Sequence, residues 1–127
     1  MYHLYQDHDP EDFQARIRIF TADEGGLGKP VFNGIRWDFS YMGDEANLYM
    51  IWPDFFDDDG NSFTSENPLP VDEWLSARMY VVIPEMRAEI HQQKIREGIK
   101  FYCMEGPRRV AEGIVSRIVG LHEDSSR

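Results

Sequence analysis

Short runs in which every second residue is apolar constrain the fold of this chain more than any other feature. In residues 13–20, FQARIRIF, the apolar side chains fall on one face of an extended backbone and the polar ones on the other. Residues 35–42, IRWDFSYM, repeat the pattern, with Trp37 and Phe39 on the apolar face. A period of two predicts half-buried strands.

Further strands are expected between turns rich in glycine and proline, at residues 46–52, 77–83, 99–104 and 108–121. Residues 84–98 fit either a strand or a short helix, and Gly113 is expected to mark a bulge or bend. The chain shows no convincing long amphipathic helix. The pattern therefore predicts an all-β fold, a closed antiparallel barrel of Greek-key type with six to seven strands.

The length of 127 residues predicts one domain. We expect a lead-in at residues 1–12, the barrel at 13–121 with an acidic insertion at about 53–70, and a tail at 122–127. The first ten residues have no positive cluster and no apolar stretch, and no apolar run reaches the roughly 20 residues of a membrane-spanning helix. These features favour a cytoplasmic protein.

The net charge of -10 arises from one segment. Between Trp37 and Ala77 there is no Lys or Arg, whereas outside this segment 13 acidic and 13 basic residues cancel. Such a field disfavours nucleic acid and anionic membranes as partners and favours a basic protein surface. Acidity that serves only solubility is the alternative. The segment holds ten acidic residues: Asp38, Asp44, Glu45, Asp54, Asp57, Asp58, Asp59, Glu66, Asp72 and Glu73.

The stretch DFFDDDGNSFTSE, residues 54–66, is close to a calcium-binding loop in spacing but fails in detail. Twelve residues ending at Glu66 begin at Phe55, where the first ligand must be an oxygen donor. The four histidines are scattered, and Cys103, the only cysteine, has no base that the sequence places beside it. We therefore expect no metal, no cofactor and no enzymatic activity.

The same stretch suits a protein interface, because aromatic residues stand beside carboxylates. In the alternative, Trp52 and one phenylalanine close the end of the barrel and the aspartates keep the loop soluble. The predicted partner-binding residues are Trp52, Asp54, Phe55, Phe56, Asp57, Asp58, Asp59, Glu66 and Trp74.

Two separated parts of the chain, residues 13–42 and 96–121, carry a resemblance to a known domain. The first part has an Asp-Glu-Gly-Gly turn, a proline and a Phe-x-Gly-x-Arg run before an aromatic strand; the second has a closing hairpin. The matching residues are Asp23, Glu24, Gly25, Gly26, Pro30, Phe32, Gly34, Arg36, Phe39, Gly98, Phe101, Glu105, Gly106, Arg108, Val110, Gly113 and Val115. In these positions the chain resembles the C-terminal β-barrel, domain III, of bacterial elongation factor Tu.

The resemblance implies a binding module, since nothing in the chain matches a phosphate-binding GxxxxGK[ST] loop. Our hypothesis is an immunity-type protein that blocks a basic toxin or effector site by stoichiometric binding. The alternative is an accessory of translation that contacts tRNA or the ribosome through Arg36, Arg108 and Arg109, in the region where the family's barrel helps to hold aminoacyl-tRNA.

Overall fold

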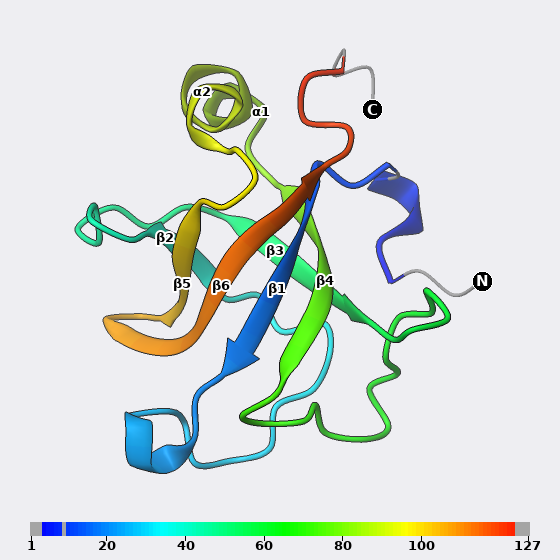
Figure 1. Ribbon diagram of the computed structural model, residues 1–127, viewed down its shortest axis with the longest axis vertical. Coiled ribbons are helices and arrows are strands. Elements are labelled where there is room, and N and C mark those ends of the chain that lie inside the picture. Colours follow the sequence, from blue (N-terminus) through cyan, green and yellow to red (C-terminus); the bar gives the residue numbers. More distant parts are fainter. Residues whose placement is uncertain (1–3, 9, 124–127) are drawn as a thin grey trace.

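The computed structural model describes residues 4–8 and 10–123, and in them the chain forms one curled antiparallel sheet of six strands (Figure 1). The strand order is β2-β5-β6-β1-β4-β3, so β1 lies between β6 and β4 near the middle. The strands are β1 (Phe13–Ile19), β2 (Asp38–Tyr41), β3 (Ile51–Phe56), β4 (Trp74–Val81), β5 (Lys100–Glu105) and β6 (Arg108–Ile118). The expected all-β class is thereby confirmed.

The segment 84–98, which the sequence left open, contains a short helix and no strand. It consists of α1 (Pro84–Met86), a π-helical turn η3 (Arg87–His91) and α2 (Gln92–Lys94), which follow one another without a break. Pro84 suits the first helical turn, where a backbone N–H has no partner within the helix. Two shorter turns, η1 (Gln6–His8) and η2 (Ala22–Glu24), lie before and after β1.

The prediction of a closed barrel is wrong, because the sheet is an open half-barrel. The edge strands β2 and β3 approach one another, but within residues 4–8 and 10–123 a single bridge joins this region, between Phe39 and Tyr49. Each of these two residues donates its N–H to the other's carbonyl at 2.8 Å. The paired part of β2 is only four residues long and β3 begins at Ile51, so no continuous ladder closes the gap in the described part of the chain.

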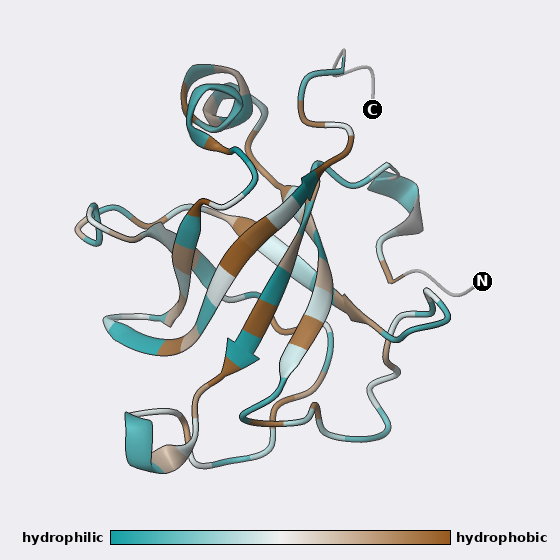
Figure 2. Cartoon of the chain, in the orientation of Figure 1, coloured by the Kyte–Doolittle hydropathy of each residue, from teal (hydrophilic) through white to brown (hydrophobic). Residues whose placement is uncertain are grey.

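Alternating side chains from the strands fill the concave side of the sheet. Figure 2 shows this alternation as bands of hydrophobic and hydrophilic residues along β1. Phe39 stacks on Phe101 with ring centroids 4.4 Å apart, and Phe13 meets Phe39 edge to face at 6.3 Å. These aromatic contacts from β1, β2 and β5 join the two halves of the curled sheet.

Of the bulge or bend predicted at Gly113, the structure contradicts the bulge. It pairs in register with Ile17 and with Phe101, and the register shifts lie elsewhere, at Gln14/Ala15 and at Cys103/Met104. Gly113 instead leaves room for an aromatic ring, because a Cβ at this position would lie 2.3 Å from the Phe101 ring.

The acidic insertion predicted at residues 53–70 is partly core. β3 continues to Phe56, so residues 53–56 are strand, and the loop between β3 and β4 covers residues 57–73. Pro53 is tolerated because β3 is an edge strand. The strand expected at 46–52 begins only at Ile51.

The end of the predicted lead-in is tied into the fold by a buried ion pair. Arg87 donates from Nε to Asp12 at 2.9 Å, and the other Asp12 oxygen accepts the Val81 N–H at 2.7 Å. Arg87 also donates to the carbonyls of Gly120 and Glu123. One guanidinium therefore joins the region before β1, the helix and the segment after β6.

Candidate protein-binding surface

The acidic stretch after β3 is a tight, internally bonded turn at residues 57–61. The Asp57 N–H donates to the Asn61 carbonyl at 2.9 Å, and Asp57 Oδ1 accepts the N–H groups of Asp59 and Asn61 at 2.9 and 3.0 Å. Gly60 has φ +83°, a conformation that favours glycine. We call residues 57–61 the acidic turn. Its first carboxylate holds the backbone, which leaves the next two facing outward.

A buried polar network supports the base of the acidic turn. Asp54 is fully buried and accepts hydrogen bonds from Asn33 Nδ2 at 2.9 Å and Ser62 Oγ at 2.7 Å. Arg78 lies 3.5 Å from Asp54 and donates to the carbonyl of Gly60, inside the turn. Because the side chains of this network are buried, the network fixes where the turn leaves the sheet.

Two of the predicted partner-binding residues are completely buried and cannot contact a partner. Asp54 and Phe55 are 0% exposed, Asp54 in the network above and Phe55 in the apolar core. Phe56 is half-buried under the Arg78 guanidinium, which lies 4.3 Å from its ring centroid. The alternating pattern of β3 explains the difference, since Phe55 faces the concave side and Phe56 the convex side.

The two predicted tryptophans differ in exposure. Trp52 is half-buried, with the Arg36 guanidinium 4.3 Å from its ring and Tyr5 beside it at 6.5 Å. Trp74 begins β4 and is 44% exposed. Trp74 therefore remains available to a partner, whereas Trp52 is partly covered.

Several acidic residues of the predicted segment are neutralised within the chain. Asp44 lies 3.6 Å from Lys94, Glu45 lies 2.5 Å from Arg109, and Asp72 lies 2.7 Å from Arg18. The Asp57 carboxylate accepts hydrogen bonds from two backbone N–H groups. In the part of the chain that the structure describes, the exposed acids of the segment without an ion pair are Asp58, Asp59, Glu66 and Glu73.

Arg18 holds two loops in position. From the sequence it could be assigned only to the polar face of β1. Its guanidinium contacts Glu24 at 2.8 Å, Asp72 at 2.7 Å and Glu112 at 2.6 Å. The hydrogen bond to Glu24 and those to the other two carboxylates raise the pKa of Arg18. Hydrogen bonds from Arg18 and from Thr21 lower the pKa of Glu24 to about 2.

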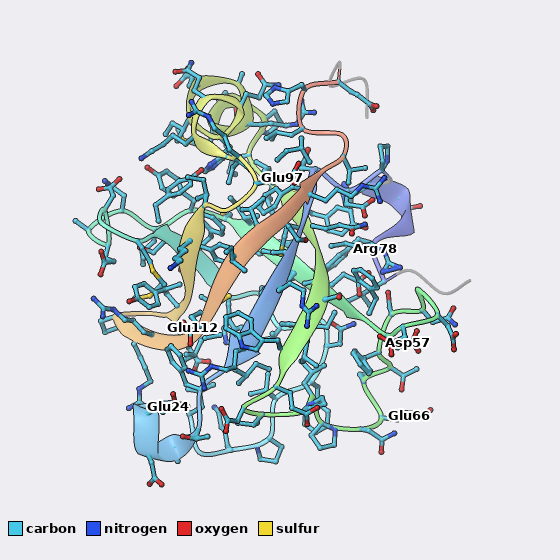
Figure 3. All side chains as sticks on the ribbon, viewed as in Figure 1. Glu24, Asp57, Glu66, Arg78, Glu97 and Glu112 are labelled. Carbon is cyan, nitrogen blue, oxygen red and sulfur yellow. The ribbon has the colours of Figure 1, made fainter. Side chains whose placement is uncertain are left out.

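The Arg18 contacts join two loops that are distant in sequence, one carrying Glu24 and the other Asp72. Figure 3 labels Glu24 on the first of these loops, Glu66 on the second and Glu112 on β6. The spacing Thr21-x-x-Glu24 is that of a capping box, which η2 forms. That spacing is the signal from which the position of Glu24 could have been predicted.

An apolar pocket of about 350 Å³ lies between the same two loops. The Leu69 N–H donates to the Val31 carbonyl at 2.7 Å, and the Asp72 N–H donates to the Ile19 carbonyl at 2.9 Å. These bonds hold the walls of the pocket against β1 and against each other. Its lining includes Ile19, Leu27, Val31, Leu69, Val71 and Val110.

Of the three arginines of the alternative, RNA-binding hypothesis, Arg36 lines a groove, whereas Arg108 and Arg109 are not among its lining residues. The other side of this groove includes Glu105 and Gly106, at the β5–β6 turn that Arg108 follows. Arg36 covers the Trp52 ring, and Arg109 is paired with Glu45 and lies 4.5 Å from the Tyr102 ring centroid. Arg108 donates to the Gly26 carbonyl at 3.5 Å.

The side chains of Cys103, on β5, and His91, in η3, are both buried. Burial raises the pKa of the Cys103 thiol to about 12, so the thiol is protonated near neutral pH. His91 Nδ1 lies 2.6 Å from the Tyr41 hydroxyl. Among residues 4–8 and 10–123, no group of three His, Cys, Asp or Glu side chains is placed to hold a metal ion.

Comparison of the chain with models of known protein families finds no match. In the described part of the chain, no helix combines the length and the apolar character needed to cross a membrane.

Proposed function

We propose that this chain is a non-catalytic protein-binding domain of the immunity type, which blocks a basic site on a toxin or effector by stoichiometric binding. The observation that carries the proposal is the set of exposed carboxylates without an ion pair: Asp58, Asp59, Glu66 and Glu73. Two of them stand on the acidic turn, which is fixed by Asp57 and by the buried pair of Asp54 and Arg78. The resemblance to elongation factor Tu domain III that we propose from the sequence would also suit a stand-alone binding module.

A fixed acidic turn favours a basic protein partner for two physical reasons. Uncompensated carboxylates attract a positively charged surface and raise the association rate at low ionic strength. A turn that is already ordered loses little conformational entropy when it binds. Trp74, exposed at the start of β4 beside Glu73, adds an aromatic side chain of the kind common in interface hot spots.

The test is affinity capture from lysate of the source organism at low and moderate salt. The decisive variant carries Asp58→Lys and Asp59→Lys. The matched control carries Glu85→Lys and Glu89→Lys, two exposed acids on the helix. We expect the wild type and the control to retain one basic protein in stoichiometric amount, and the turn variant to lose it at least tenfold. Thermal unfolding confirms that all three proteins are folded.

The immunity role itself is tested with the captured protein. Expressed alone, it should arrest growth, and co-expression of the wild-type chain should relieve the arrest, whereas the turn variant should not. A captured protein that is harmless alone would contradict the immunity role. Equal retention by the turn variant and the control would contradict the acidic surface.

The alternative function, an accessory of translation, is favoured by one observation, the position of Arg36 and the β5–β6 turn on the same groove. Its basic groups are partly compensated, since Arg109 is paired with Glu45. Recovery of tRNA or ribosomal components that is lost on Arg36→Glu and Arg108→Glu would replace the first proposal with this one.

A further inference from the structure

Residues 4–8, which we call the latch, contact the buried network at the base of the acidic turn. Leu4 donates its backbone N–H to Ser62 Oγ at 3.0 Å and to Asp54 Oδ2 at 3.3 Å. Both acceptor residues are buried, Ser62 at 4% and Asp54 at 0% exposure. The latch therefore supplies one of the donors that satisfy the Asp54 carboxylate away from water.

Side chains of the latch pack on the sheet beside this hydrogen bond. The Tyr5 ring lies 6.5 Å from the Trp52 ring on β3 and meets the Tyr80 ring on β4 edge to face at 5.2 Å. Leu4 approaches Gly34, where a Cβ would lie 3.7 Å from Leu4 Cδ2. Figure 1 shows this segment at the side of the sheet, next to β4.

Two contacts lead from the latch to the acidic turn. Leu4 bonds Asp54, and the Arg78 guanidinium lies 3.5 Å from the same Asp54 oxygen and donates to the Gly60 carbonyl. Figure 3 labels Arg78 on β4 and Asp57 at the start of the turn. Members of a buried polar network depend on one another, so loss of the Leu4 donor should admit water to Asp54 and loosen the hold of Arg78 on the turn.

The latch is packed less closely than the strands that it covers. A cavity of about 150 Å³ lies beneath it, and side chains that border a void lose contacts. Leu4 and Tyr5 are only half-buried. Segments with such contacts open at a lower free energy than core strands do. The chain after the latch is held by the ion pair of Asp12 and Arg87, so the latch can leave while the sheet stays folded.

We propose that the latch controls the acidic turn: the docked latch keeps the turn ordered for binding, and release of the latch loosens the turn and weakens binding. The inference rests on the proposed function, because it names how that binding surface is regulated. An ordered turn loses less conformational entropy on binding than a loose one. Cleavage of the chain just after the latch, or a competitor that draws the latch away, would act through the same contact.

The test compares two substitutions at one position. Leu4→Pro removes the N–H that Asp54 and Ser62 accept, whereas the control Leu4→Ala keeps it and shortens only the side chain. The measurement is hydrogen exchange, followed by NMR, of the three amides that donate within the acidic turn, those of Asp59, Gly60 and Asn61.

We expect exchange at these three amides to quicken by about tenfold in Leu4→Pro and by no more than about twofold in Leu4→Ala. The amides of β1 should keep their wild-type rates in both variants, which shows that the sheet is folded. Equal quickening in the two variants would overturn the role of the Leu4 N–H.

A second background tests the route of the effect. In the Ser62→Ala protein one acceptor of the Leu4 N–H is already missing, so Leu4→Pro should quicken exchange less than it does in the wild type. An effect of the same size in both backgrounds would mean that Leu4 does not act through the buried network, and would overturn the inference.

The outcomes separate this inference from the proposed function. Affinity for the basic protein captured above should fall by about fivefold in Leu4→Pro and stay unchanged in Leu4→Ala. Unchanged exchange in Leu4→Pro would overturn the latch, whether or not a partner is captured. Faster exchange with undiminished affinity would retain the proposed function and overturn the control of binding. Faster exchange with no captured partner would retain the hold of the latch on the turn, and the proposed function would fail.

Discussion

His91 is a buried histidine whose protonation the fold opposes. It is 1% exposed, and its ring lies among Phe39, Tyr41 and Tyr49. Burial lowers the pKa of His91 from 6.5 to about 4; Lys94 lowers it further and Asp12 opposes the change. Nδ1 contacts the Tyr41 hydroxyl, whereas Nε2 has no hydrogen-bond partner in the described part of the chain. The imidazole of His91 is therefore neutral in the folded protein near neutral pH.

We expect this histidine to make stability depend on pH in mild acid. Between about pH 6.5 and pH 4 the unfolded chain binds a proton that the folded chain does not. The free energy of unfolding should therefore fall as the pH falls, by up to about 3 kcal/mol in total. Urea unfolding at several pH values measures this slope. His91→Gln should flatten it, whereas His122→Gln, at an exposed position, should not. Parallel slopes for the two variants would disprove the assignment.

Gly113 shows how one missing side chain can determine the packing of a core ring. A methyl group at this position would lie 2.3 Å from Phe101, which is fully buried and cannot move aside freely. Gly113→Ala should therefore destabilise the fold by about 1–3 kcal/mol, measured by chemical unfolding. Ser116→Ala, at an exposed position of β6, is the control. In the Phe101→Leu background the cost of Gly113→Ala should shrink, and an unchanged cost would point to the backbone instead of the ring.

At the scale of elements, β3 and the acidic turn form one unit through Asp54. Asp54→Ala should cost about 3–5 kcal/mol, because it leaves the buried Arg78 without its carboxylate. Amide hydrogen exchange in the turn should quicken as well. Asp58→Ala, on the same turn but exposed, should change stability by no more than about 0.5 kcal/mol. A second variant, Asp54→Ala with Arg78→Met, should recover part of the loss; no recovery would mean that the charge pair is not the cause.

The elements that the sequence predicted well are those whose period is unbroken. β1 could be predicted from its alternation of apolar and polar residues alone. The hairpin of β5 and β6 could be predicted from the same alternation and from the turn at Gly106. β3 was missed in part because Pro53 and Asp54 look like loop residues. The burial of Asp54 depends on Ser62, in the next loop, and on Asn33 and Arg78, which lie more than 20 residues away in sequence. Strand and turn propensities of the individual residues do not indicate such partners.

At the scale of the molecule, composition indicated the acidic character but not which acids are exposed and unpaired. Arg18 stands outside the segment without basic residues, yet it neutralises Asp72 inside it. The apolar pocket is likewise built from two loops whose meeting depends on the sheet order. The open edge between β2 and β3 could not be predicted either, because strand lengths decide it and their ends are the least certain feature of a sequence pattern.

The division of the acidic residues into two groups has an evolutionary consequence. Asp54, Asp57 and Asp72 are used inside the chain, whereas Asp58, Asp59, Glu66 and Glu73 make no ion pair in the described part of it. Substitutions in the second group leave the folding contacts untouched. Such a scaffold can drift toward a new partner one surface residue at a time, since each intermediate still folds.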